Sequence, residues 1–134
     1  MYAMSNAALL NKYQSDSVMT ASPMELIVML YEALIKQMRL SDIFLEEKDY
    51  ERANQHLLRA QDIVSELLRS LDLKYPISNN LMQLYTFMLE ELADINMHKD
   101  RTRLVPLLEI AGELKDAWVE VRNSGARAYA TIEE

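Results

Sequence analysis

Residues 50–71 show the most regular hydrophobic pattern in the chain. The apolar residues recur in steps of three and four: Tyr50, Ala53, Leu57, Ala60, Val64, Leu67 and Leu71. This heptad-like spacing is typical of a helix that packs one side against other helices. The opposite side is charged or polar, which indicates that it faces solvent. The pattern therefore predicts a helix within a helical bundle.

A strong helix start precedes this segment. Ser22 can cap a helix with its hydroxyl, Pro23 suits the first helical position, and Glu25 completes a capping box. A helix is therefore predicted to begin there. The polar turn at 46–49 ends with Asp49, which can cap the next helix.

Two further helices are predicted after Pro76. The first covers residues 79–96, and its apolar stripe consists of Leu81, Tyr85, Met88, Leu92 and Ile95. The second begins at Thr102 or Pro106 and ends at Gly125. Its apolar positions are Leu107, Ala111, Leu114, Trp118 and Val121.

Few residues are available for turns, because only 2 Gly and 3 Pro occur among 134 residues. The fold class that we expect is all-α, an antiparallel four-helix bundle with an N-terminal capping segment. Residues 1–19 are predicted to be a flexible or capping segment. Residues 20–125 form the bundle, and residues 126–134 form a C-terminal tail.

Composition excludes several classes of function. The chain has no Cys, so it has no disulfide, thiolate metal site or cysteine nucleophile. A net charge of −7 repels phosphate backbones, so no nucleic acid is expected as a partner. No apolar run approaches the roughly 20 residues of a membrane span, and no secretory signal is visible. We expect a cytoplasmic protein without membrane insertion.

Catalytic and metal-binding motifs are also missing. Neither of the 2 histidines follows a glutamate by three residues, as a di-metal carboxylate bundle requires. We therefore predict no metal, no cofactor and no enzymatic activity. A histidine phosphotransfer bundle using His56 is an alternative. Arg59 could supply the cation of that motif, but Ala60 replaces its glycine, which favours an ordinary boundary histidine.

Short motifs along almost the whole chain match one protein family in order and spacing. They are Tyr13, Thr20, Ala21, Ser22, Pro23, Leu26, Ile27, Met29, Leu30 and Tyr31, then Leu84, Tyr85, Met88, Asn96 and Asp100, and finally Asp116, Ala117 and Trp118. On these motifs the chain resembles the FliS proteins, flagellin-specific chaperones of the bacterial flagellar secretion system. Glu90 and Glu91 depart from the pattern, since many relatives have basic residues there.

The resemblance implies a four-helix bundle that binds the disordered C-terminal segment of flagellin. Such a chaperone prevents premature polymerisation in the cytoplasm and assists delivery to the flagellar type III export apparatus, without ATP or metal. Export gate components or a co-chaperone are further candidate partners, and the chaperone is a monomer or a homodimer. A purely structural, oligomerising bundle is the second alternative.

Candidate client-binding or capping residues are apolar positions near the matching motifs or beyond what the helical seams require. They are Leu9, Leu10, Tyr13, Leu26, Ile27, Tyr31, Met82, Tyr85, Met88 and Leu89. A tyrosine on an apolar helix face is more often part of the core, and dimer packing would explain Met82 and Leu89 equally well. Leu9, Leu10 and Tyr13 could fold over an apolar groove as a latch, or belong to a frayed terminus.

Deleting residues 1–12 tests the latch. If the segment covers an apolar groove, its removal should raise both the affinity for the client and self-association, because the groove is then open. Titration calorimetry with a client peptide and sedimentation analysis would measure the two effects. Unchanged values for both would discard the latch.

Overall fold

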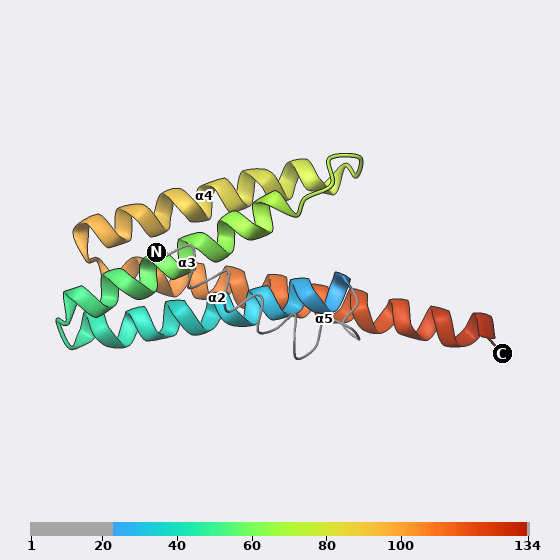
Figure 1. The fold of residues 1–134 in the computed structure, drawn as a ribbon, viewed down its shortest axis with the longest axis horizontal. Coiled ribbons are helices and arrows are strands. Elements are labelled where there is room, and N and C mark those ends of the chain that lie inside the picture. Colours follow the sequence, from blue (N-terminus) through green and yellow to red (C-terminus); the bar gives the residue numbers. More distant parts are fainter. Residues whose placement is uncertain (1–22, 134) are drawn as a thin grey trace.

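The computed structural model describes the backbone of residues 23–133 and the side chains of residues 23–124. These residues form four α-helices and one turn of 3-10 helix (Figure 1). The elements are α2 (Pro23–Glu46), α3 (Tyr50–Arg69), α4 (Ile77–His98), η1 (Arg101–Arg103) and α5 (Leu104–Glu133). Successive helices run in opposite directions, so the predicted all-α antiparallel bundle is confirmed.

The predicted cap and turn before α3 agree with the structure. Helix α2 runs from Pro23, the first described residue, to Glu46, and the predicted cap Ser22 lies outside the described residues. The carboxylate of Asp49 accepts a hydrogen bond of 3.2 Å from the backbone N–H of Arg52, which caps α3. Lys48 lies just before this cap with φ 60, a left-handed conformation that closes the turn.

The core lies along the stripes that the sequence predicted. All five predicted α4 positions are buried, and on α3 the buried residues include Ala53, Leu57, Ala60, Val64 and Leu67. Tyr50 of the predicted stripe is instead 47% exposed at the first position of α3. Helix α2 packs against α3 and α5, and α3 also packs against α4. Figure 1 shows α4 lying beside α3, on the side away from α2 and α5.

Two predictions about α5 were wrong. The helix begins at Leu104, after the 3-10 turn, so that Pro106 lies in its first turn, where a proline N–H is not needed. It also continues through Gly125 to Glu133, although a stop at Gly125 was predicted. A glycine ends a helix when its backbone turns left-handed, whereas inside a helix it costs only about 1 kcal/mol relative to alanine.

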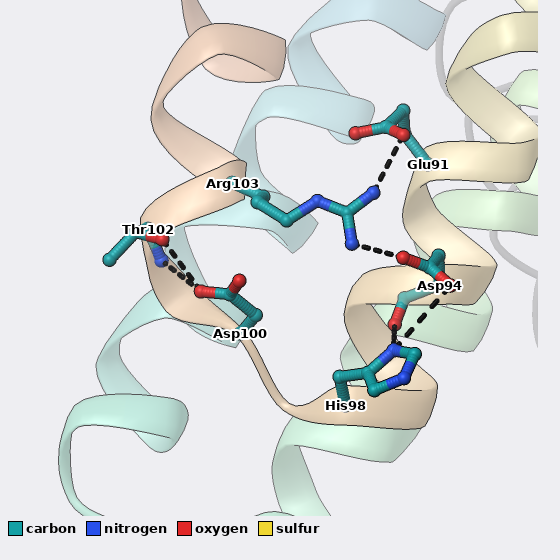
Figure 2. Close-up of polar contacts among 6 residues, drawn as sticks. All are labelled: Glu91, Asp94, His98, Asp100, Thr102 and Arg103. Atoms are coloured by element: carbon teal, nitrogen blue, oxygen red, sulfur yellow. Dashed lines mark hydrogen bonds and ion pairs between the residues drawn. The ribbon is translucent and has the colours of Figure 1, made fainter.

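Two arginines at η1 connect α5 to both α2 and α4. Arg101 donates a hydrogen bond of 2.6 Å to the carboxylate of Asp42 on α2. Arg103 binds Glu91 at 2.7 Å and also binds Asp94, both on α4 (Figure 2). Helices α4 and α5 make only marginal direct contact. These ion pairs therefore add to the short connection and the buried Leu104, which bring α4 and α5 together at the η1 end.

Helices α2 and α3 share a polar and aromatic contact around His56. Its ring stacks on Phe44 with centroids 5.3 Å apart, and its Nδ1 lies 2.7 Å from Oε1 of Gln37. Burial lowers the pKa of His56, and the positive charges of Arg59 and Lys36 lower it further. The neutral ring suits this site, because its Nδ1–H can donate to the amide oxygen.

The lowered pKa makes stability depend on pH. The unfolded chain binds a proton at its ordinary pKa of 6.5, whereas the folded chain binds it only at lower pH. The stabilisation from His56 is therefore full above pH 6.5 and is lost as the pH falls towards the folded pKa. Urea unfolding between about pH 7.5 and about pH 5 should show a steeper loss of stability for the wild type than for His56→Gln. Equal pH slopes would contradict this assignment.

The η1 ion pairs predict a change in the titration of Asp94. Its hydrogen bond with Arg103 is the main reason that the pKa of Asp94 lies below its ordinary value. Arg103→Gln should raise this pKa towards the ordinary value, measured by NMR titration of the side-chain carboxyl carbon. Arg101→Gln is the matched control, because Arg101 pairs with α2. An Asp94 pKa that is the same in all three proteins would rule out the Arg103 pairing.

Candidate functional site

The ion pairs of Arg103 show which sides of α4 and α5 face each other. Arg103 directly precedes α5, and Glu91 and Asp94 lie in the last turns of α4. Positions about one, two or three turns apart lie on the same side of a helix. Because the helices are antiparallel, the facing sides continue from Glu91 towards the start of α4, and from Arg103 towards the end of α5.

Apolar side chains occupy both facing sides. On α4, Phe87 and Leu84 lie about one and two turns before the carboxylate that binds the arginine. On α5, Ile110, Leu114 and Val121 lie about two, three and five turns after the arginine. Phe87 is 46% exposed and Val121 is 48% exposed, whereas the other three are partly buried. We call these five residues the α4/α5 face.

Burial of the α5 seam decreases with distance from η1. Leu107 and Ala111 are buried, Leu114 and Trp118 are only partly buried, and Val121 is exposed. All five belong to one predicted seam, so the sequence pattern itself does not change along the helix. The change arises because α4 scarcely contacts α5 and diverges from it away from the η1 end (Figure 1). Apolar surface that a closed bundle would cover is therefore available here.

Three aromatic side chains from three helices meet beside this face. The hydroxyls of Tyr31 on α2 and Tyr85 on α4 share a hydrogen bond in the core, with ring centroids 6.4 Å apart. Burial is the main cause that raises the pKa of both hydroxyls, and a hydrogen bond with Trp118 acts in the opposite direction on Tyr31. These contacts join α2 to α4 across the bundle interior, although the two helices are not neighbours.

The structure distributes the predicted site residues over different environments. Tyr31, Tyr85 and Met88 are at most 1% exposed, so they belong to the core and have no surface for direct contact with a partner. Leu26 and Ile27, near the start of α2, are partly buried. Leu9, Leu10 and Tyr13 lie outside the described residues.

Met82 and Leu89 do not lie on the α4/α5 face. Met82 is 38% exposed, and Leu89 is partly buried against the core. Met82 precedes Phe87 by five residues, which turns the two side chains to different sides of α4. The sequence-based candidates included neither Phe87 nor Ile110. The signal for Ile110 was its spacing of seven residues from Arg103, which is informative only once the partner of Arg103 is known.

The described residues offer little support for other chemistry. They contain no group of three or more metal-binding side chains. The ring of His56 is stacked on Phe44, and its Nδ1 is engaged by Gln37, as expected of a structural histidine. None of the helices that the structure describes is long and apolar enough to cross a membrane.

The solved structures include one with the same fold. It is described as the crystal structure of a flagellar chaperone from bacteria, and it superposes with a TM-score of 0.73 over 89% of this chain and 98% of that chain. The sequence identity is only 16%, so this similarity concerns the fold alone.

Comparisons of sequence identify the family. Residues 4–125 match the family model of the flagellar protein FliS. The flagellar secretion chaperone FliS of Bacillus subtilis (strain 168) is 34% identical over 112 residues, which are 84% of each chain. The FliS chaperone of Campylobacter jejuni is 27% identical over 123 residues, 90% of this chain and 96% of the relative. The chain therefore belongs to the FliS family of flagellar secretion chaperones.

Proposed function

We propose that this chaperone binds the disordered C-terminal segment of flagellin on the α4/α5 face. Binding keeps the segment from polymerising in the cytoplasm and accompanies the subunit to the flagellar type III export apparatus. Family membership supports a flagellar export client. The observation that carries the choice of surface is the pair of facing, half-exposed apolar stripes on α4 and α5.

The length of the face suits a helical client. From Ile110 to Val121, the α5 part of the face extends about 17 Å, which equals roughly three turns of a bound helix. Ordering a 20-residue disordered segment costs roughly 20–40 kcal/mol, whereas burying about 1,000 Å² of apolar surface returns only about 25 kcal/mol. A small pocket would therefore not suffice. A helix laid between α4 and α5 buries apolar residues on both sides along its length.

Aromatic and branched side chains, and not methionines, provide this surface. The chain has 9 Met, but none belongs to the α4/α5 face. Among the described methionines, Met38 and Met88 are buried, whereas Met82 and Met97 are exposed on other sides. Phe87 is the main candidate anchor, because large rigid rings contribute strongly to binding when they become desolvated.

The proposed chaperone acts by binding alone, without a catalytic step, ATP or metal. The N-terminal latch remains part of the proposal: Leu9, Leu10 and Tyr13 would cover the α4/α5 face until the client displaces them. Export gate components or a co-chaperone would then meet the loaded complex.

Single charges on the α4/α5 face should weaken client binding. Phe87→Glu and Val121→Glu each place a carboxylate where the client's apolar side would lie, and desolvating it costs more than the interaction returns. Each variant should bind a flagellin C-terminal peptide at least about tenfold more weakly, since about 1.4 kcal/mol is enough for a factor of ten. Titration calorimetry measures the change.

Two matched variants serve as controls. Met97→Glu changes an exposed apolar residue of α4, and Val105→Glu changes an exposed valine of α5, both away from the face. They should bind the peptide within about twofold of the wild type. Equal weakening by all four variants, or by none, would show that the client binds elsewhere. Failure of the wild type to bind at micromolar concentration would reject the chaperone–flagellin proposal itself.

A further inference from the structure

A second surface lies on the other side of α5. Between the outer sides of α2 and α5 is a pocket of about 540 Å³. Its apolar lining comes from Ile35, Leu40 and Ile43 of α2, and Ile43 is 47% exposed. None of the α4/α5 face residues lines this pocket. The helical positions of its α5 residues point away from the side that faces α4.

A glycine in the wall of the pocket has no packing role within the described residues. Gly112 lies inside α5, where a glycine costs about 0.5–1 kcal/mol relative to alanine. A Cβ atom added there would meet nothing within 4 Å. Internal crowding therefore does not explain the missing side chain. A glycine at such a position allows another backbone to approach the helix closely.

The charge of the pocket differs from that of the whole chain. The net charge of the chain is −7, but the pocket contains three cations, Lys36, Arg39 and Lys115. Lys115 lies 4.0 Å from the carboxylate of Glu32, and Asp116 is the second acidic residue of the lining. Lys36 and Arg39 are exposed and form no ion pair or hydrogen bond with any residue that the structure describes. They are available to an incoming carboxylate.

We propose that the α2/α5 pocket binds an acidic, amphipathic helical segment of a second protein. A large apolar side chain of that segment enters between Ile35, Leu40 and Ile43. Its backbone crosses α5 at Gly112, and its carboxylates pair with Lys36 and Arg39. Because the pocket and the α4/α5 face lie on different sides of α5, the second protein and the flagellin client bind at the same time.

The probe is a designed 16-residue peptide with leucine and phenylalanine on one helical side and glutamate on the other. A counterpart has lysine at every glutamate position. Fluorescence anisotropy of labelled peptides measures affinity for the full chain, and amide NMR shifts locate the contact. The acidic peptide should bind and shift the amides of Arg39 and Gly112, whereas the basic peptide should bind at least about tenfold more weakly.

Charge exchange gives the sharpest test. Arg39→Glu should lower the affinity for the acidic peptide at least about tenfold. The double variant Lys36→Glu with Arg39→Glu should bind the basic peptide more tightly than the acidic one. Lys74→Glu is the matched control for Arg39→Glu, because Lys74 is exposed in the α3–α4 connection and its exchange produces the same change of net charge as that single variant. It should change the affinity by less than about twofold.

Gly112→Leu tests the close approach of the backbone independently of charge. Because the space around this position is open, the variant should fold normally, which thermal unfolding checks, and should still bind the flagellin peptide. Gly112→Leu should lower the affinity for the acidic peptide, whereas Phe87→Glu should leave that affinity unchanged. Absence of saturable binding at about 100 μM, or an affinity that responds to Phe87→Glu but not to Arg39→Glu, overturns the proposal. Either result leaves flagellin binding at the α4/α5 face untouched.

Discussion

The short η1 connection between α4 and α5, to which Arg101 and Arg103 add ion pairs, determines where the bundle is closed. One arginine reaches α2 and the other reaches α4, so the start of α5 is fixed against both helices. Beyond this point α5 continues to pack on α2 but scarcely contacts α4. The apolar surface of the α4/α5 face thus depends on a connection at one end only, because the place where two helices are joined decides how much of their facing sides they bury.

Hydrophobic spacing was sufficient to predict the helices and most of the core. The α4 stripe and the cap at Asp49 both follow from local rules, since each depends on neighbours in the sequence. The exposed face could not be predicted in this way. Ala111 and Val121 share one seam, yet only Ala111 is buried, because periodicity identifies an apolar side but not whether another helix covers it. The continuation of α5 through Gly125 could not be predicted either, because a glycine can end a helix or lie inside one and its residue type alone does not decide between the two.

Helix α5 separates two surfaces of different character. Towards α4 it presents apolar side chains such as Ile110 and Val121, and the arginine at the start of this side, Arg103, is engaged by Glu91 and Asp94. Towards α2 it forms a pocket that combines apolar and cationic groups. An apolar surface can bind many amphipathic helical sequences, whereas a charged surface discriminates between partners by the sign of their charge. The two proposed interactions therefore use different physical means on one rigid element.

The position of Trp118 gives the protein an internal optical reporter. It is the only tryptophan of the chain, and it is partly buried against the core at the edge of the open apolar surface. The wavelength of indole emission depends on the water around the ring. Occupation of the neighbouring surface therefore changes the spectrum of the unlabelled protein, and a ligand that lacks tryptophan can be followed without any dye.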